Sequence, residues 1–385
     1  MTPAAREAAA IEILDRWRTG VAVEAALTHW GRASRFAGSG DREAVRDLVF
    51  QAVRRARSAA ALGGDTGRGL LLGLARGAGR VPDGWTGERH TPAPLGDAER
   101  ALLVATLPDL VRGEALDCPD WLLPYLDAAL GASADPVLEL MRDRAPVFVR
   151  VNRARADRAS VVADLAALGI ETRPHPLADT ALEVTANARR LRNAAALQDG
   201  LVELQDAASQ AVALDFARAA RGPVLDYCAG GGGKALALAA EGFAVTAHDA
   251  DSRRMRDLPA RAARAGASID ILPGAPSGHW PAIFADAPCS GSGSWRRAPE
   301  AKWAFTPARL AELTATQDAI LARCAALTAP GGVLGYATCS LLEDENEARV
   351  RVFLETHKGW RIEAERRLSP LDGGDGFYLA VLRCD

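Results

Sequence analysis

The stretch VLDYCAGGGGKALALAA, residues 224–240, decides the fold, because it reads as a buried strand, a glycine turn and the start of a helix. Glycines let a backbone approach a ligand closely, and the first turn of a helix offers free N–H groups. The next predicted strand, FAVTAHD over 243–249, ends in an acidic residue. A strand, a glycine turn and a helix with an acid at the end of the following strand are typical of doubly wound α/β domains.

Strands and helices alternate from about residue 205 to the end of the sequence. Strands are predicted over 223–229, 243–249, 269–274, 282–288, 331–340 and 377–384. This alternation predicts an α/β fold class, a Rossmann-like domain with a doubly wound, mostly parallel sheet. Functional side chains are then expected at the carboxyl ends of the strands.

The remainder of the 385-residue chain predicts further domains upstream of this one. The predicted organisation is an all-helical domain, a linker with helices, a small α+β module and the α/β domain, over 1–76, 77–141, 142–200 and 201–385 respectively. Ten arginines face six acids between residues 142 and 192, so the small module is locally basic. That charge favours contact with RNA phosphates, with a solvated surface as the alternative.

Composition excludes several classes of protein. Hydrophobic residues make up 49% and charged residues 25% of the chain, which argues against a mainly disordered protein or a fibre. The N-terminus lacks a secretory signal, and no apolar run is long enough for a membrane helix. The six cysteines include no CxxC pair, so no metal site is expected, and a cytoplasmic protein with free thiols is predicted.

The glycine loop does not have the spacing of a dinucleotide-binding GxGxxG or of a phosphate-binding P-loop. Together with an acid at the end of the next strand, it indicates a site for an adenosyl-type cofactor. Asp249 is the first choice for the ribose hydroxyls and Asp251 the second. A purely structural turn capped by an acid is the alternative.

Two cysteines stand at the ends of predicted strands, Cys289 in FADAPCSGSG and Cys339 in YATCSLLEDENE. In a doubly wound sheet both ends can face the same crevice, so the two thiols could lie side by side. A disulfide or redox pair is the competing interpretation. Two thiols, an aspartate and an adenosyl cofactor suggest methylation at carbon 5 of a pyrimidine, in which one thiol adds to carbon 6 and a second group assists release.

Five ordered motifs, namely LQDAASQ, LDYCAGGGGK, DAPCSGSG, RRAPEAKW and YATCS with ENE after it, make the chain similar to a known family. Over about residues 146–385 it resembles the RNA cytosine-5 methyltransferases of the Sun/Nol/Nop group, in which the RsmB-type 16S rRNA enzymes of bacteria sit. The first 76 residues resemble, more weakly, the NusB-like helical domain of those enzymes. The resemblance implies RNA, in particular 16S rRNA, as the partner.

The resemblance also implies roles for single residues. Cys339 matches the nucleophile of the family, and Cys289 matches the cysteine that helps to release the product. Asp286 matches the residue that contacts N3 and the amino edge of the cytosine. Lys234 matches the lysine that closes the glycine loop near the base and the cofactor. Spacing alone leaves open which cysteine attacks.

The implied cofactor is S-adenosyl-L-methionine. Its cradle would be formed by backbone groups of Cys228, Ala229, Gly230, Gly231, Gly232 and Gly233, together with Lys234 and Asp286. Asp249 would hold the ribose, and Arg254 falls where the family places an arginine near the cofactor.

The chain departs from the family pattern at the glycine loop. Gly230 and Gly231 replace an alanine and a proline, and Ala235 replaces a threonine, so ordering the loop costs more entropy. The third predicted strand offers no acid beyond Asp270. Two other functions are therefore kept: the same chemistry on tRNA, and a non-catalytic RNA-binding factor of ribosome assembly on a methyltransferase scaffold.

Overall fold

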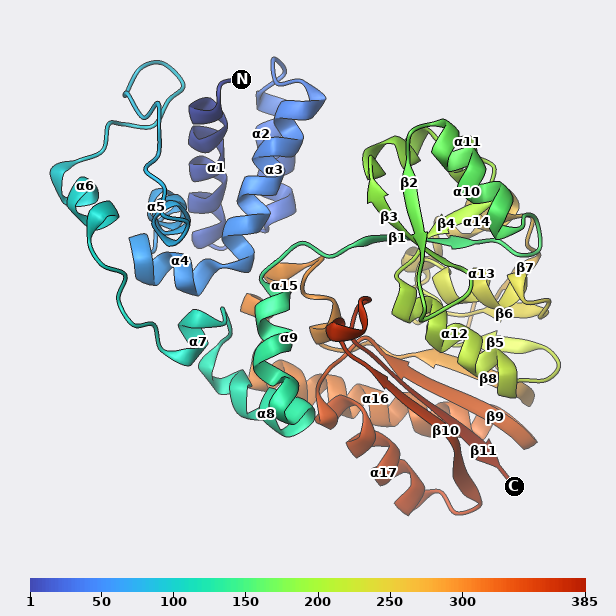
Figure 1. The fold of residues 1–385 in the computed structure, drawn as a ribbon. Helices are drawn as coiled ribbons and strands as arrows, with labels where there is room; N and C mark the ends of the chain where they lie inside the picture. Colours follow the sequence, from blue (N-terminus) through green and yellow to red (C-terminus); the bar gives the residue numbers. More distant parts are fainter. The chain divides into compact units, whose positions relative to one another are not determined.

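The computed structural model describes all residues from 1 to 385, and they form two compact units (Figure 1). The helical unit comprises Met1–Asp127, Gly131–Arg144 and Trp295–Ala304. The α/β unit comprises Ala128–Leu130, Ala145–Ser294 and Phe305–Asp385. None of the helices combines the length and the apolar character that crossing a membrane requires.

The helical unit is built around a bundle of five helices at the start of the chain. They are α1 (Pro3–Arg18), α2 (Val23–Ala33), α3 (Ser39–Arg54), α4 (Ala56–Gly63) and α5 (Gly67–Gly77). Their apolar faces meet in a core that includes Leu14, Val49, Val53 and Leu70, all fully buried. After the loop 78–96, shorter helices follow, namely α6 (Asp97–Val104), α7 (Arg112–Ala115), α8 (Leu123–Leu130) and α9 (Ala134–Met141).

A segment from much later in the sequence completes the helical unit. Residues Trp295–Ala304, which include α15 (Pro299–Ala304), follow directly after the Cys289 loop in the chain. The Glu300 carboxylate accepts hydrogen bonds from the backbone N–H of Val23 at the start of α2, with both oxygens 3.1 Å away. The Trp303 indole donates to the carbonyl of Val53 over 2.7 Å. The RRAPEAKW motif is therefore bound to helices α2 and α3 of the bundle.

A small four-stranded sheet opens the α/β unit. Its strands are β1 (Val147–Val151), β2 (Glu171–Pro174), β3 (Ala181–Ala186) and β4 (Val202–Leu204), in the order β2-β3-β1-β4 and antiparallel throughout. Helix α10 (Arg158–Ala167) packs Val161 and Leu165 on the apolar side chains of this sheet, and the short α11 (Ala195–Gln198) precedes β4.

The large sheet has seven strands in the order β10-β11-β9-β8-β5-β6-β7. They are β5 (Val224–Asp226), β6 (Val245–Ala247), β7 (Ile269–Ile271), β8 (Trp280–Asp286), β9 (Thr328–Thr338), β10 (Trp360–Leu368) and β11 (Phe377–Cys384). The five strands β5 to β9 run parallel to one another. Strand β11 runs antiparallel to both of its neighbours, β9 and β10. The strand order reverses direction at β5, and such a reversal opens a crevice at the carboxyl ends of the central strands.

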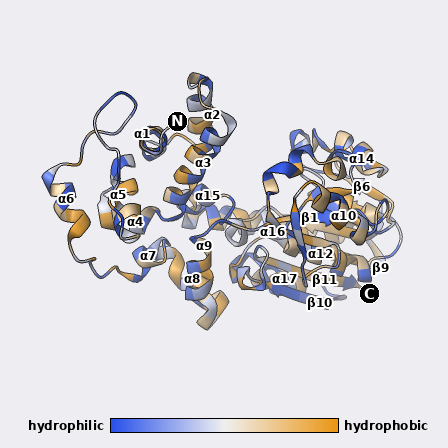
Figure 2. Ribbon diagram, turned by 45° about the horizontal axis from the view of Figure 1, so that its top comes forward, coloured by the Kyte–Doolittle hydropathy of each residue, from blue (hydrophilic) through white to orange (hydrophobic).

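Helices cover both faces of the large sheet (Figure 1). On one face lie α12 (Ala207–Ala219) and α13 (Gly233–Ala240), and on the other lie α16 (Pro307–Leu327) and α17 (Glu347–Thr356). Helix α14 (Leu258–Ala265) packs beside the glycine loop. The strands between the layers carry apolar side chains, while the edge strand β10 is largely hydrophilic (Figure 2).

The predicted fold class is confirmed, since the α/β unit is a doubly wound, mostly parallel sheet preceded by a small α+β sheet and a helical region. All six strands predicted after residue 205 exist, and three of them, β5, β6 and β7, are shorter than expected. Strand β10 was not predicted, because WRIEAERRL pairs on one side only and exposes many of its charged side chains. Strands of this kind carry little apolar periodicity.

Close backbone contact between α4 and α5 yields a prediction about stability. A Cβ atom added to Gly73 would lie 1.9 Å from the carbonyl oxygen of Ala59, whereas one added to Gly40 in α3 meets nothing within 4 Å. Gly73→Ala should lower the free energy of unfolding of the helical unit by about 2–3 kcal/mol, because two helix backbones must separate.

The matched control Gly40→Ala should leave that free energy unchanged or raise it by up to about 1 kcal/mol, because alanine favours helix over glycine. Denaturant unfolding followed by the fluorescence of the buried Trp17 and Trp30 measures both effects. Equal stabilities for the two variants would contradict the close packing of α4 on α5.

Candidate functional site

The glycine loop joins β5 to α13 at the point where the strand order reverses. Gly230 and Gly232 have φ angles of 51° and 82°, in the left-handed region that favours glycine. A Cβ atom at Gly232 would also lie 2.2 Å from the side chain of Leu258 on α14. The sequence GGGG therefore lets the chain turn tightly between a buried strand and a helix.

Asp249 is tied to this loop from the end of the neighbouring strand. Its carboxylate accepts a hydrogen bond from the backbone N–H of Gly230 over 2.9 Å and one from the guanidinium of Arg254 over 3.0 Å. A third bond comes from the N–H of Asp251 over 2.9 Å. The structure thus brings Asp249, Arg254 and the loop together, and the side chain of Asp251 turns instead to Arg253.

The other loop residues are held by their backbone groups. Ala229 donates its N–H to the carbonyl of His248 over 2.8 Å, and Cys228 is partly buried beside it. The carbonyl of Gly231 accepts a hydrogen bond from Arg261 on α14. The carbonyl of Gly233 lies 3.3 Å from the side-chain amide of Gln205.

Gln205, in the LQDAASQ motif, is a site residue that the sequence did not single out. Its carbonyl oxygen accepts a hydrogen bond of 2.7 Å from Arg150 on β1, while its amide reaches Gly233. Arg150 is only 3% exposed, so this arginine of the basic segment does not face solvent. Gln205 therefore couples the small sheet to the glycine loop.

Lys234 and Asp286 form an ion pair between the start of α13 and the carboxyl end of β8. The Lys234 Nζ atom lies 2.5 Å from Oδ2 of Asp286, at the end of β8, and 4.8 Å from the centre of the Phe377 ring. Burial alone would lower the pKa of Lys234, but the charge and the hydrogen bond of Asp286 outweigh it and raise the pKa. The ammonium therefore stays charged, and the ion pair ties the first turn of α13 to the end of β8.

The two cysteines lie side by side, as the sequence predicted. The Sγ atoms of Cys289 and Cys339 are 3.5 Å apart, and both residues are partly buried. A disulfide has a sulfur–sulfur distance of about 2.05 Å. The contact is therefore a hydrogen bond between two thiol groups that are not linked to each other.

The environment distinguishes the two thiols. The hydrogen bond from Cys289 lowers the pKa of Cys339, against the effect of burial, and the charge of Lys234 contributes to the lowering. The same hydrogen bond, together with burial, raises the pKa of Cys289 well above its ordinary value. Cys339 is thus the sulfur that carries negative charge more readily, and Cys289 is the one that keeps its proton.

Asp226, at the end of β5, is a second residue that the sequence analysis missed. It is fully buried, and neither carboxylate oxygen has a hydrogen-bond partner within the chain. Burial, followed by the charge of Asp286, raises its pKa from near 3.8 to about 7. Buried carboxylates without partners are costly, so this one fits a site that receives a cationic or hydrogen-bonding ligand.

The structure therefore gathers every residue of the predicted site around the ends of β5, β6, β8 and β9. Asp270, the one acid considered on the third strand, lies exposed on β7. The missed Asp226 could have been found from its place as the last residue of VLD before the glycine turn. A loop of glycine N–H groups, a buried orphan carboxylate and the carboxylate of Asp249 together fit S-adenosyl-L-methionine, whose amino group and sulfonium are cationic.

The raised pKa of Asp226 predicts a dependence of stability on pH. An acid whose pKa is higher in the folded than in the unfolded state holds extra protons when folded, so it reduces stability as pH rises from about 4 to about 7. Asp226→Asn removes that group, so the variant should gain stability relative to the unaltered chain across this range and keep the gain above it.

Urea unfolding followed by circular dichroism between about pH 5 and about pH 8 measures this difference. The exposed Asp270→Asn serves as the control and should show no such trend. A stability difference for Asp226→Asn that does not change with pH would contradict the buried, unpartnered state of this carboxyl.

Comparison with known proteins gives two matches to family models. Residues 211–372 match the family described as 16S rRNA methyltransferase RsmB/F. Residues 118–189 match the ferredoxin-like domain of RsmF/B-like methyltransferases, which agrees with the four-stranded antiparallel sheet.

Individual relatives extend these matches. The ribosomal RNA small subunit methyltransferase B of Vibrio cholerae is 33% identical over 283 residues, which cover 69% of this chain and 64% of that protein. The chain thus spans just under two thirds of this relative. The protein of the same name from Sodalis glossinidius is 31% identical over 317 residues, covering 77% of this chain and 70% of that protein.

Among solved structures, PH0851 resembles the chain over 99% of both proteins with a TM-score of 0.78 and 20% identity. NSun6 from Pyrococcus horikoshii covers 69% of this chain and 98% of its own, with a TM-score of 0.61 and 17% identity. These two likenesses concern the fold. From its sequence relatives and the matching family model, the chain belongs to the RsmB/F family of 16S rRNA methyltransferases, whose cofactor is S-adenosyl-L-methionine.

Proposed function

We propose that this protein transfers a methyl group from S-adenosyl-L-methionine to carbon 5 of a cytosine in 16S rRNA, through a covalent bond between Cys339 and the base. The observation that carries the proposal is the contact of 3.5 Å between the Sγ atoms of Cys289 and Cys339, beside the ion pair of Lys234 and Asp286. The compartment we propose is the cytoplasm. The relatives are ribosomal RNA small subunit methyltransferases B, which supports rRNA rather than tRNA as the substrate.

Cys339 is the nucleophile in this proposal. Its thiolate adds to carbon 6 of the cytosine, so a carbon–sulfur bond forms and the double bond between carbons 5 and 6 opens toward carbon 5. The bound cofactor supplies an electrophilic methyl group to that carbon. The lowered pKa of Cys339 favours this role over Cys289, since the thiolate is the attacking species.

Asp286 and Lys234 act on the polar edge of the base. Addition at carbon 6 raises the electron density of the ring at N3, and a hydrogen bond there stabilises the adduct. Asp286 would contact N3 and the amino group: its carboxylate would accept from the amino group, and a proton taken from the Lys234 ammonium, 2.5 Å away, would let it donate to N3. In the same crevice, Asp249 and the backbone of residues 228–233 would bind the cofactor.

Release requires that carbon 5 lose its proton. The electrons of that carbon–hydrogen bond then restore the double bond, and the bond from carbon 6 to Cys339 breaks, so Cys339 leaves as a thiolate. Cys289 is the group we assign to this step, because its sulfur is already in contact with that of Cys339. As the charge on Cys339 disappears in the adduct, the main cause of the raised pKa of Cys289 disappears with it. Cys289 would then release its own proton to water and, as a thiolate, take the proton from carbon 5.

RNA would be gripped by the exposed arginines of the small sheet module. They are Arg153, Arg155, Arg158, Arg173, Arg189, Arg190 and Arg192. Contacts of this kind go to phosphates and fix the position of the RNA without reading its sequence. The target cytosine must leave its stack to reach the two sulfurs in the crevice.

Substitution of each cysteine by alanine tests the two assigned roles. Cys339→Ala should abolish methylation of 16S rRNA, because no covalent bond to carbon 6 can form. Cys289→Ala should instead accumulate an RNA–protein adduct that survives denaturing electrophoresis, because the bond forms and is not resolved. Radioactive methyl incorporation and gel mobility measure these outcomes.

Cys384→Ala is a suitable control, since Cys384 lies at the end of β11 away from the two strand ends. It should methylate as the unaltered protein does. Full activity of Cys339→Ala would refute the covalent mechanism, and the absence of an adduct with Cys289→Ala would refute the role of that thiol in release.

A further inference from the structure

A buried glutamate, Glu345, joins the loops that carry the two cysteines. It is the first residue of the ENE motif, ends the short helix Glu343–Glu345 and is fully shielded from solvent. One carboxylate oxygen accepts from the backbone N–H of Ser290 over 2.8 Å and from the side-chain amide of Gln317 over 3.1 Å. The other accepts from the hydroxyls of Ser290 and Ser340, each over 2.5 Å.

The two serines are the residues that directly follow the two cysteines. Ser290 comes after Cys289 and Ser340 comes after Cys339. Their hydroxyl oxygens are 3.2 Å apart. One carboxylate therefore binds each of the two loops at the residue next to its cysteine. A second link lies nearby, where the N–H of Gly293 donates to the carbonyl of Cys339 over 3.0 Å.

We propose that Glu345 is a positioning residue, which ties the loop of Cys289 to the loop of Cys339 and thereby keeps the two sulfur atoms in contact. It touches neither the base nor the cofactor in the proposed reaction. The inference rests on the proposed function, because only the proposed reaction gives the paired sulfurs a role. The contact between Cys289 and Cys339 can nevertheless be measured without RNA.

The charge of Glu345 supports this role. Among the causes that raise the pKa of Cys289, after the hydrogen bond with Cys339 and burial, is the negative charge of Glu345. A carboxylate at this place therefore also helps to keep the proton on Cys289, whose S–H group donates a hydrogen bond to the sulfur of Cys339. A glutamine at this place would keep one of the two acceptor oxygens and lose that effect.

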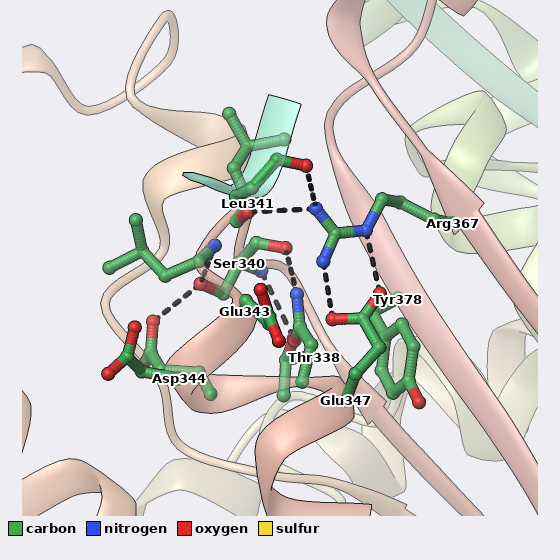
Figure 3. Close-up of polar contacts among 12 residues, drawn as sticks. Thr338, Ser340, Leu341, Glu343, Asp344, Glu347, Arg367 and Tyr378 are labelled. Carbon is green, nitrogen blue, oxygen red and sulfur yellow. Dashed lines mark hydrogen bonds and ion pairs between the residues drawn. The ribbon is translucent and has the colours of Figure 1, made fainter. Parts of the chain in front are cut away.

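Other contacts hold the fold of the Cys339 loop when Glu345 is changed. Asn346 accepts a hydrogen bond of 2.5 Å from Thr338 and donates one of 3.0 Å to the carbonyl of Ser340. Arg367 lies between Leu341 and Glu347, as Figure 3 shows, and donates to both. These bonds hold the Cys339 loop against β9, α17 and β10, whereas Glu345 binds Ser290 in the other loop.

Phenylarsine oxide tests whether the two sulfurs remain together. This reagent forms two arsenic–sulfur bonds only when two thiols are adjacent, and its oxygen leaves as water with the two thiol protons. The unaltered protein should bind it through Cys289 and Cys339, and Cys289→Ala should not. Glu345→Ala should bind it at least about tenfold more weakly, because lost hydrogen bonds to a charged group let the loops separate.

Glu343→Ala is the matched control, since Glu343 lies two residues away and pairs with Arg351 at the surface. It should bind the arsenical like the unaltered protein. Wild-type affinity in a folded Glu345→Ala protein overturns the proposal.

If the Glu345→Ala protein does not fold, Glu345→Gln provides a second test of the proposal. Glutamine retains one oxygen that can accept from the two serine hydroxyls, but it removes the charge. Alkylation of Cys289 by iodoacetamide should therefore begin at lower pH than in the unaltered protein. Peptide mass spectrometry identifies the alkylated cysteine. An unchanged pH profile, with Glu343→Gln as the control, overturns the proposal.

Assay of RNA methylation separates this inference from the proposed function. If the unaltered protein binds the arsenical but makes no 5-methylcytosine, the proposed function fails and the thiol measurements still decide the role of Glu345. If the unaltered protein methylates RNA and Glu345→Ala keeps both its arsenical affinity and its rate, only the role of Glu345 fails.

Discussion

The parallel pairing of β8 with β9 is the constraint on which the site depends. In its register Asp286 lies opposite Ala337, so the two strands end at the same level of the sheet. Cys289 follows three residues after Asp286, and Cys339 follows two residues after Ala337. Two loops that leave neighbouring parallel strands at one edge can then bring both sulfur atoms within 3.5 Å of each other. A change of register by one residue would turn one of these loops toward the opposite face.

The carboxyl ends of the central strands also bring together several negative charges, which other groups of the protein must balance. Asp226, Asp249 and Asp286 end three adjacent strands or follow them closely, and Lys234 is the cation that pairs with Asp286. Asp249 is satisfied by Arg254 and by backbone N–H groups, whereas Asp226 has no partner within the chain. The site therefore has two ion pairs, Lys234 with Asp286 and Arg254 with Asp249, and one acid that remains available to a ligand. That division suits a crevice that binds a cationic cofactor beside a nucleophilic sulfur.

The sequence predicted the positions of the candidate site residues well wherever a motif stands at a strand end. The glycine loop, Asp249, Asp286 and both cysteines were placed correctly, because parallel strands of a doubly wound sheet present their carboxyl ends to one crevice. Residues whose role depends on distant partners were missed. Glu345 looks like a surface acid in LEDENE, and only the folded chain reveals that its carboxylate meets two serines from separate strands. Likewise, no local pattern predicts that Glu300 and Trp303 pack on helices more than 200 residues earlier in the chain.

Bisulfite sequencing of total RNA from cells with and without the gene tests the central claim most directly. Methylation at carbon 5 protects a cytosine from conversion by bisulfite, so the reaction, the base and the substrate are observed in one experiment. The account predicts that one protected cytosine of 16S rRNA becomes convertible when the gene is lost. A protected site lost from tRNA would contradict the proposed substrate, and unchanged protection in all RNA would contradict the proposed activity.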